Sequence, residues 1–335
     1  MAATFWTRPP GAKPASGTRD SDVNREARPR ALVTGGAGFL GSHLCERLLA
    51  EGYLVLCLDN LSKGVRENVV HLEGDPGFEY IHHDITLPLR IEGPLNEVYH
   101  FASPASPKDF ERIPVEILLA GSAGTHNALE VALAKGARFL LASSPEVYGD
   151  PLVHPQHEDY RGNVSTTGVR SVYEEAKRYA EALTTAYLRH RGLHARIARI
   201  FNAYGPRTRP GDERVVPSFI SQALAGIPLT VYGDGTQTRS LQYADDLVDG
   251  ALRLIRSDEG RPVNIGNPVE HTVHEIAEMV IELSGSRSEI VHQPLPGDDP
   301  RRRCPDITRA RESLGWEPKT PIGEGLEKTL AWFAR

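Results

Sequence analysis

Hydrophobic residues in the first part of the chain form short continuous runs, separated by a segment of helical spacing. The runs 31–34 and 54–58 are apolar almost throughout, as expected of strands that are buried on both faces. Between them leucines recur every fourth residue, with charged residues on the opposite side, at Leu40, Leu44 and Leu48. This spacing predicts an amphipathic helix between two strands.

The alternation of strand-like and helix-like segments continues to about residue 200. The pattern predicts further strands at 78–82, 97–101, 138–142 and 195–200, and helices at 117–135 and 173–191. Strands that alternate with helices predict an α/β fold with a doubly wound parallel sheet. Beyond residue 201 prolines and glycines become frequent, which suits a smaller C-terminal lobe that closes over a ligand.

Composition and charge exclude several classes of protein. Lys and Arg number 38 against 44 Asp and Glu, a net charge of −6, so neither nucleic acid nor an anionic membrane is an expected partner. No stretch approaches the roughly 18 consecutive apolar residues of a membrane span. Residues 1–29 contain no apolar segment typical of a secretory signal, and we expect a disordered tail there.

The three cysteines are widely spaced along the chain, at Cys45, Cys57 and Cys304. They form neither a C-x-x-C pair nor a zinc-binding pattern, so the sequence predicts no metal site. Thiols without such pairing fit a reducing compartment, and we expect a cytoplasmic protein.

A glycine loop lies between the first strand and the first helix. Residues 34–41 read T-G-G-A-G-F-L-G, with glycines at G-x-x-G-x-x-G spacing. Glycines let the backbone approach a pyrophosphate, to which the start of the helix offers N–H groups and the positive end of its dipole. Asp59, about 20 residues on, would bond the adenosine ribose and repel a 2′-phosphate. The loop therefore predicts an NAD site in preference to NADP.

Other residues at the ends of the predicted strands extend this cofactor site. Asp84, after the third strand, would contact the adenine or cap a helix. The candidate cofactor-binding residues are Gly35, Gly38, Phe39, Leu40, Gly41, Asp59, Asn60, Asp84, Ile85, Ala102, Ser103, Tyr173 and Lys177.

Tyr173 and Lys177 stand four residues apart at the start of a predicted helix, and therefore on the same face. A tyrosine with its usual pKa near 10 is a poor base at neutral pH, but a neighbouring ammonium group favours the phenolate and lowers the pKa. We expect Lys177 to act in this way and to bond the nicotinamide ribose. The Y-x-x-x-K pattern alone is common; the glycine loop and Ser144, after the intervening strand, make it a candidate catalytic site.

These motifs together resemble the extended short-chain dehydrogenase/reductases, whose members act on nucleotide sugars. Within that superfamily the chain is similar to the UDP-glucuronic acid decarboxylases (UDP-xylose synthases) from about Ala31 to the C-terminus. The segments that carry the similarity include A-S-P-A-S-P at 102–107, and also 140–151, 198–207, 229–233, 299–307 and 314–318. The resemblance implies a Rossmann-type NAD-binding domain at 30–200. It also implies a mainly nucleotide-sugar-binding lobe at 201–335, part of which returns to the first domain.

The resemblance implies a decarboxylation of UDP- or TDP-glucuronic acid with no net redox change. Tyr173 would remove the proton of the sugar 4-hydroxyl while NAD takes the C4 hydride. The resulting 4-ketone places the C5 carboxylate β to a carbonyl, so the loss of carbon dioxide leaves an enolate. C5 is then protonated and the hydride returns to C4, which gives the nucleotide-linked pentose, such as UDP-xylose, and leaves the cofactor unconsumed.

The resemblance also assigns side chains to this reaction. Ser144 would bond the 4-oxygen, Glu146 would act near C5, and Arg303 would place the carboxylate or a phosphate. The candidates for the nucleotide diphosphate pocket are Asn202, Arg214, Tyr232, Arg239 and Arg303. The Tyr232 ring would stack on the pyrimidine or belong to the core. Members of the family are dimers, so a homodimer through a four-helix bundle of 117–135 and 173–191 is expected.

Three positions depart from the pattern of the decarboxylases. Leu119-Ala120-Gly121 stands where the family commonly has Lys-Thr-Asn, Ser144 replaces a threonine, and Pro145 replaces a serine. A cation, an amide and a hydroxyl are thereby lost near the site. We hypothesise that some 4-keto pentose leaves the enzyme before the hydride returns.

Two other functions remain open at this point. A UDP-sugar 4-epimerase would share the glycine loop, Tyr173, Lys177 and NAD, but would retain the carboxylate of the sugar. A non-catalytic NAD-binding regulator would keep the fold, although it has no need of an intact Ser144, Tyr173 and Lys177 together.

Overall fold

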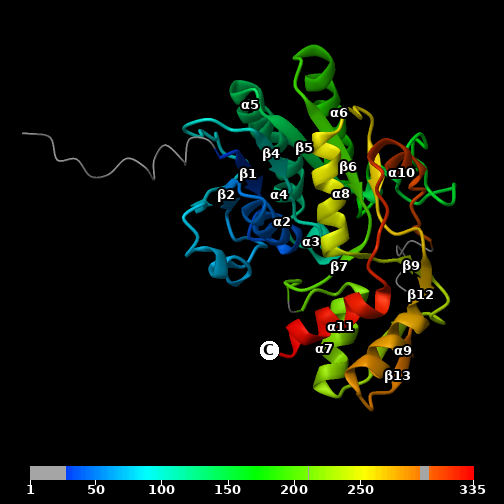
Figure 1. Ribbon diagram of the computed structural model, residues 1–335. Helices are drawn as coiled ribbons and strands as arrows, with labels where there is room; N and C mark the ends of the chain where they lie inside the picture. The colour runs from blue at the N-terminus through cyan, green and yellow to red at the C-terminus, as the bar shows by residue number, and fades with distance from the viewer. Residues whose placement is uncertain (1–27, 210, 295–301) are drawn as a thin grey trace, which may run out of the picture.

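Seven parallel strands form the central sheet, in the order β11-β6-β5-β4-β1-β2-β3 (Figure 1). The computed structural model describes residues 28–209, 211–294 and 302–335, so nearly all of the expected tail lies outside the described residues. The strands are β1 (Arg30–Thr34), β2 (Leu54–Asp59), β3 (Phe78–His82), β4 (Glu97–His100), β5 (Arg138–Ser143), β6 (Ala195–Ile200) and β11 (Val263–Ile265). The prediction of a doubly wound parallel sheet is confirmed.

Helices cover both faces of this sheet because successive strand residues point to opposite sides. The covering helices are α2 (Phe39–Ala50), α5 (Thr125–Lys135), α6 (Ser171–His190), α8 (Ala244–Arg256) and α10 (Thr308–Leu314). Helices α2, α8 and α10 share one hydrophobic core with strand residues such as Val33. Helices α5 and α6 share a second core with the alternate strand residues, such as Leu32.

The predicted helix 117–135 is divided into three parts. It begins as α4 (Pro114–Leu119), passes through a π-helical turn at Ala120–Gly124, and continues as α5. A proline is favourable in the first turn of a helix, since the N–H that it lacks has no partner there anyway, and α4 accordingly starts at Pro114. A π-turn widens the helix locally, and this one lies against α6.

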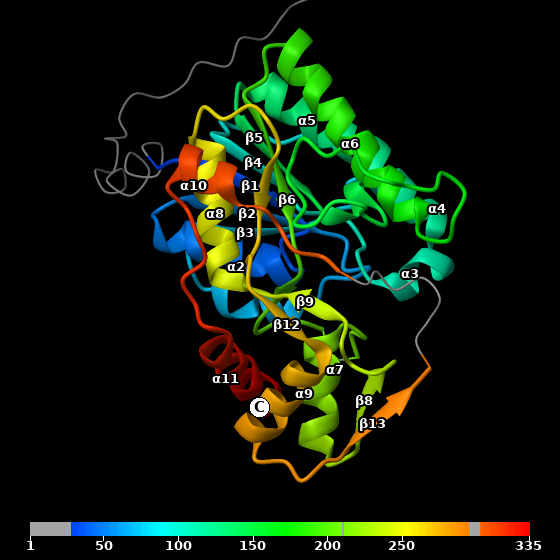
Figure 2. The same ribbon diagram turned by 90° about the vertical axis from the view of Figure 1, so that its right-hand side faces the viewer.

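A smaller lobe lies beyond the sheet, around a separate hydrophobic core (Figure 2). Its helices are α7 (Val215–Ala225), α9 (Val273–Ser284) and α11 (Ile322–Phe333). Three strand pairs belong to this lobe and its junction with the sheet: β8 (Leu229–Tyr232) with β13 (Ile290–Gln293), β9 (Thr238–Ser240) with β12 (Glu270–Thr272), and β7 (Ala203–Tyr204) with β10 (Gln242–Tyr243). Short helices complete the described structure: α3 (Pro107–Arg112), and 3-10 turns at Arg66–Asn68, Val70–Leu72 and Pro145–Tyr148.

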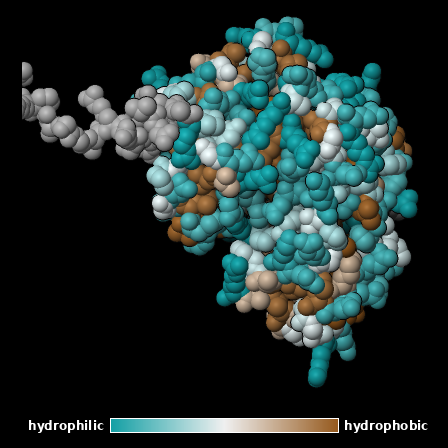
Figure 3. Space-filling view, in the orientation of Figure 1, coloured by the Kyte–Doolittle hydropathy of each residue, from teal (hydrophilic) through white to brown (hydrophobic). Residues whose placement is uncertain are grey.

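The C-terminal part of the chain contributes both to the sheet with its covering helices and to the smaller lobe. Strand β11 pairs with β6 at the edge of the sheet, and α8, α10 and Trp316 belong to the sheet core. Figure 3 shows a mainly hydrophilic face, on which hydrophobic residues gather most clearly low on the lobe, where α7 and α11 lie. Among the described residues, every helix is too short or too polar to cross a membrane.

Candidate active site

A cavity of about 1410 Å³ lies between the sheet and the lobe. One wall consists of residues that follow the carboxyl ends of β1 to β5, where ligands bind in open α/β sheets. The opposite wall comes from the lobe and from Arg303. Every residue named above as a catalytic, cofactor-binding or substrate-binding candidate lines this cavity.

The glycine loop forms the wall beside β1. A Cβ atom added at Gly41 would lie only 2.1 Å from the carbonyl oxygen of Gly35, so only glycine lets the helix start against the loop. Among the described residues no side chain caps the N-terminus of α2, where the N-cap residue is Gly38. The loop therefore fits a pyrophosphate that rests on the helix N-terminus.

Asp59 stands at the end of β2, next to this loop. Its Oδ2 accepts a hydrogen bond from the Ala37 N–H at 3.1 Å, and its Oδ1 accepts one from the Leu61 N–H at 2.8 Å. Burial raises the pKa of Asp59, against the lowering effect of these hydrogen bonds. Two more buried polar atoms on this wall, Ser103 Oγ and His83 Nε2, have no hydrogen-bond partner among the described residues. Buried polar atoms are seldom left unpaired, so they too fit a polar ligand such as NAD.

Asp84 is held in a turn and caps no helix, so the alternative of a helix cap is wrong. Its Oδ1 accepts hydrogen bonds from the Thr86 N–H at 2.9 Å and the Thr86 hydroxyl at 2.8 Å. The Asn60 amide donates to its Oδ2 at 3.1 Å. These contacts outweigh partial burial and keep the pKa of Asp84 below its ordinary value. Asn60 and Asp84 thus form one polar edge of the cavity, with Ile85 beside them.

Tyr173, Lys177 and Ser144 meet where α6 crosses the end of β5. Tyr173 is buried, lies near enough to Ser144 for that hydroxyl to act on its pKa, and stacks on Phe110 with ring centroids 5.2 Å apart. Lys177 donates a hydrogen bond from Nζ to the Ala142 carbonyl oxygen at 2.8 Å. The predicted helix brings both side chains to the cavity, since i and i+4 lie on one face.

The pKa of Tyr173 differs from the expectation. Burial, with the negative charge of Glu146, raises it to about 12, although the Ser144 hydroxyl and two arginines act in the opposite direction. Lys177 is not among the main causes that act on the pKa of Tyr173, so the expected net lowering does not occur. The Lys177 Nζ lies 5.5 Å from the Tyr173 ring centroid, and burial lowers the pKa of Lys177 to about 8. Burial penalises both charged forms and here exceeds their mutual attraction.

Glu146 is clamped between two arginines beside Tyr173. Arg303 meets the carboxylate with two N–H groups, one at 2.7 Å from Oε2 and the other on Oε1. Arg170 Nη2 lies 2.7 Å from Oε1 and 2.8 Å from Oε2. Together the arginines overcome the effect of burial and lower the pKa of Glu146 to about 2. Glu146 is therefore an anion here, and its partners are the cations best suited to another carboxylate.

Sequence reasoning missed Arg170 and Phe110. Arg170 lies directly before α6, and its guanidinium is 5.6 Å from the Phe110 ring, while Phe110 in turn stacks on Tyr173. The signal that could have identified Arg170 is its position three residues before Tyr173, about one helical turn away. Phe110 gave no signal, because a phenylalanine in a short helix is usually a core residue.

The predicted diphosphate-pocket residues stand on the lobe side of the cavity. Arg214 forms a two-point contact with Asp212, at 3.0 Å and 2.8 Å. Tyr232 is 45% exposed, which excludes the alternative of a core residue. Arg239 donates to the Thr238 carbonyl oxygen at 2.8 Å, and the Asn202 carbonyl accepts from Gln242 N–H at 2.8 Å.

The positions that depart from the family pattern also lie at this site. Leu119 and Ala120 line the cavity, and a Cβ atom at Gly121 would lie 2.7 Å from the Cβ of Ala176 on α6. Pro145 begins a 3-10 turn for which Ser144 accepts the capping hydrogen bond, from Glu146 N–H at 3.3 Å. The positions that depart from the pattern therefore lie on the cavity wall and at the contact between the π-turn and α6.

Comparisons with known proteins agree with this geometry. Residues 31–266 match the model of the NAD dependent epimerase/dehydratase family. UDP-glucuronic acid decarboxylase 1 of Danio rerio is 49% identical over 313 residues, which cover 93% of this chain and 74% of that protein.

Two solved structures share this fold. UDP-glucose 4-epimerase of Thermotoga maritima, solved with UDP-glucose, is 31% identical with a TM-score of 0.82, over 91% of this chain and 98% of that one. The dTDP-glucose 4,6-dehydratase of Streptomyces venezuelae, solved with NAD, is 30% identical with a TM-score of 0.81, over 91% and 96% of the two chains.

Proposed function

Because this chain belongs to the NAD dependent epimerase/dehydratase family, we propose that it converts a nucleotide-linked glucuronic acid to the corresponding pentose by decarboxylation. One observation carries the proposal: two arginines meet at a buried carboxylate, Glu146, directly beside the proton-transferring Tyr173. A cluster of that kind gives a substrate carboxylate a charged partner next to the reacting carbon. The relative at 49% identity, which bears the name of a UDP-glucuronic acid decarboxylase, supports the same substrate.

The first proton transfer belongs to Tyr173 and Ser144. The Ser144 hydroxyl would hydrogen bond to the sugar 4-oxygen, and Tyr173, as the phenolate, would accept the proton of the 4-hydroxyl. Because the pKa of Tyr173 is about 12, the phenolate would need the added positive charge of a bound nicotinamide. Bound NAD supplies the hydride acceptor and donor at C4. Lys177, anchored on the Ala142 carbonyl, would orient the nicotinamide ribose and place a positive charge below the Tyr173 ring.

The decarboxylation step would use the clamp around Glu146. In the 4-ketone, the bond between C5 and the carboxylate carbon would break and carbon dioxide would leave. The electron pair of that bond would form an enolate, whose oxygen Ser144 and Tyr173 would hold. The substrate carboxylate would compete with Glu146 for Arg303, while Arg170 keeps Glu146 paired. C5 would then take up a proton, which restores the ketone. Tyr173 would return its proton to the 4-oxygen as the hydride held by the cofactor goes back to C4.

The departures at 119–121 and at Pro145 bear on the last step. Leu119 and Ala120 offer the cavity no hydrogen bond from their side chains, so fewer contacts hold the ketone in place. We propose that a share of the 4-keto pentose leaves before reduction. Exclusive formation of the reduced pentose, observed by NMR of the products, would contradict this.

A homodimer through a four-helix bundle is part of the proposal. The apolar side chains Val115 and Leu118 on α4 and Tyr179 on α6 are 60%, 40% and 50% exposed, on two helices that pack together. A second copy of the chain would cover this surface. Sedimentation equilibrium should then give twice the chain mass, and Leu118→Glu should give the single mass.

Three finer points are also proposals. The cofactor half is assigned to 30–200 and the substrate lobe mainly to 201–335. The three free, buried cysteines support a cytoplasmic location. Both UDP- and TDP-glucuronate remain candidate substrates, because thymine and uracil differ by one methyl group.

The deciding experiment measures carbon dioxide and nucleotide products from UDP-glucuronate and, separately, TDP-glucuronate. We expect one equivalent of carbon dioxide for each substrate consumed, with a pentose nucleotide as product. A uronic acid epimerised at C4 and formed without carbon dioxide would establish the 4-epimerase instead. Tight NAD binding without turnover of either substrate would favour the non-catalytic regulator.

A further inference from the structure

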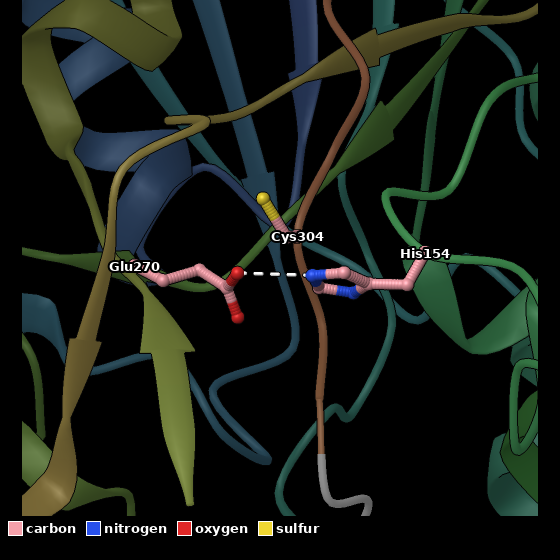
Figure 4. Close-up of side chains that lie close together, drawn as sticks. All are labelled: His154, Glu270 and Cys304. Atoms are coloured by element: carbon pink, nitrogen blue, oxygen red, sulfur yellow. Dashed lines mark hydrogen bonds and ion pairs between the residues drawn. The ribbon is translucent and has the colours of Figure 1, made fainter.

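Three side chains of types that bind metal ions converge outside the cavity. His154 comes from the loop after β5, Glu270 from β12, and Cys304 from the segment that follows Arg303 (Figure 4). One donor atom from each lies within 4.8 Å of the other two, and His154 Nε2 is 2.9 Å from Glu270 Oε2. Figure 4 shows the imidazole and the carboxylate facing each other, with the sulfur beside the gap between them.

The backbone that carries these ligands is fixed on both sides. The Gln156 N–H donates to the Cys304 carbonyl oxygen at 2.9 Å, and the Gln156 side chain accepts from the Cys304 N–H at 3.0 Å. These bonds hold the loop of His154 against the segment of Cys304. The second oxygen of Glu270 accepts a hydrogen bond from the Thr238 hydroxyl, which orients the carboxylate from behind. Such outer contacts are typical of ligands in metal sites.

We propose that His154, Glu270 and Cys304 bind one zinc ion. One nitrogen, one oxygen and one sulfur form a donor set that suits zinc, whereas magnesium and calcium prefer oxygen ligands alone. Three protein ligands leave the fourth tetrahedral position to water. The side chains of His154 and Glu270 are 30% and 24% exposed, so an ion can enter from solvent, while Cys304 closes the inner side.

Zinc at this position would fix the segment that carries Arg303. Cys304 is adjacent to Arg303, whose guanidinium meets Glu146 in the cavity, so the ion would act on the active site only through the backbone. None of the three ligands lines the cavity. The inference therefore does not rest on the proposed function, and it can be tested with the metal alone.

The test uses the full chain after removal of metals with a chelator. Cobalt(II), which replaces zinc and absorbs light, should bind one equivalent and give a thiolate-to-cobalt charge-transfer band, and zinc should displace it. Zinc should also raise the melting temperature of the protein, since the three ligands come together only in the folded state. Cys304→Ser and His154→Ala should each lose the band and the temperature shift. Cys57→Ser, which removes a thiol buried in the sheet core, is the matched control and should keep both.

Two results would overturn the proposal. The first is the absence of any thiolate band at saturating cobalt, together with no effect of zinc on melting. The second is a band that survives in Cys304→Ser, because the thiolate would then come from another cysteine. Because binding must release the thiol proton, cobalt should bind more tightly at pH 8 than at pH 6.

Discussion

The two walls of the cavity are held in different ways. On the wall with the glycine loop, backbone groups make the contacts. A Cβ added at Gly41 would lie 2.1 Å from the carbonyl oxygen of Gly35, so the loop packs directly against the start of α2. Asp59, beside it, accepts hydrogen bonds from two backbone N–H groups. The substrate wall is built from charged side chains, with Glu146 between Arg170 and Arg303 and with Arg214 on Asp212.

This difference indicates which kind of ligand each wall can bind. Closely packed backbone has few side chains that must move when a ligand binds, so the wall with the glycine loop is suited to a ligand that stays bound through the reaction cycle. Arginine–carboxylate pairs can exchange partners, so the substrate wall is suited to an anionic ligand that enters and leaves. Tyr173 and Ser144 stand where the two walls meet.

The largest effect is expected at that meeting point. Tyr173→Phe removes the proton acceptor but keeps the ring that stacks on Phe110, so turnover should fall about 10²–10⁴-fold with NAD binding unchanged. Steady-state kinetics and NAD titration measure the two quantities. Tyr179→Phe, half exposed on the same helix, should retain the wild-type rate. Unchanged turnover in Tyr173→Phe would refute the assignment of the base.

The substrate wall should show the next largest effect. Arg303→Met removes a charged partner of the substrate carboxylate, a contact worth about 1.5–3 kcal/mol, so binding of UDP-glucuronate should weaken roughly 10- to 100-fold. UDP-glucose, which has no carboxylate, should bind as before in calorimetric titrations. Arg302→Met, on the exposed neighbouring side chain, is the control. If binding of both nucleotides weakened equally, Arg303 would contact the diphosphate and not the carboxylate.

Helix α6 packs against the π-turn behind both walls, and one added methyl group can weaken this packing. A Cβ at Gly121 would meet Ala176 at 2.7 Å, so Gly121→Ala should push the π-turn and α6 apart and lower the free energy of unfolding by about 1–3 kcal/mol. Turnover should fall as well, since α6 carries Tyr173. Gly323→Ala on α11, where a Cβ meets nothing within 4 Å, should leave stability equal or slightly higher. Denaturant unfolding of both variants distinguishes a packing effect from a general intolerance of alanine.

The smallest expected effect concerns a buried carboxyl behind the clamp. Burial and the charge of Glu146 raise the pKa of Glu174 to about 6, against 4.5 when unperturbed. A raised pKa means that the folded state resists ionisation, so the ionised Glu174 lowers stability above pH 6 by about 1–2 kcal/mol. Glu174→Gln should raise the melting temperature at pH 7.5, and the gain should shrink as the pH falls from 6 to 4.5.

Glu175→Gln is the matched control for that measurement. Its side chain is 37% exposed, and its charge is the last of the causes that raise the pKa of Glu174, so the substitution should give a clearly smaller gain than Glu174→Gln. A gain for Glu174→Gln of the same size at every pH would show that ionisation is not its cause.

Local patterns in the sequence predicted the sheet well. Buried parallel strands are continuous apolar runs, and β1, β2, β3 and β6 lie within a residue of their predicted bounds. The helix at 117–135 was predicted as continuous, because a π-turn has no signature in hydrophobic spacing. The glycine loop, Asp59 and the spacing of Tyr173 and Lys177 are also local patterns, and they identified one wall of the cavity.

By itself the sequence determined the positions of the strands along the chain, the glycine loop on one wall of the cavity and the place of Tyr173 on that cavity, because each depends on local patterns of residues. Only the tertiary structure decided the electrostatics. Tyr173 has a raised pKa because burial and Glu146 outweigh Lys177, and Glu146 is clamped by Arg170 and by Arg303, which is 157 residues away. The convergence of His154, Glu270 and Cys304 likewise has no sequence spacing to reveal it. Charges act through space and burial, and neither is encoded in the distance along the chain.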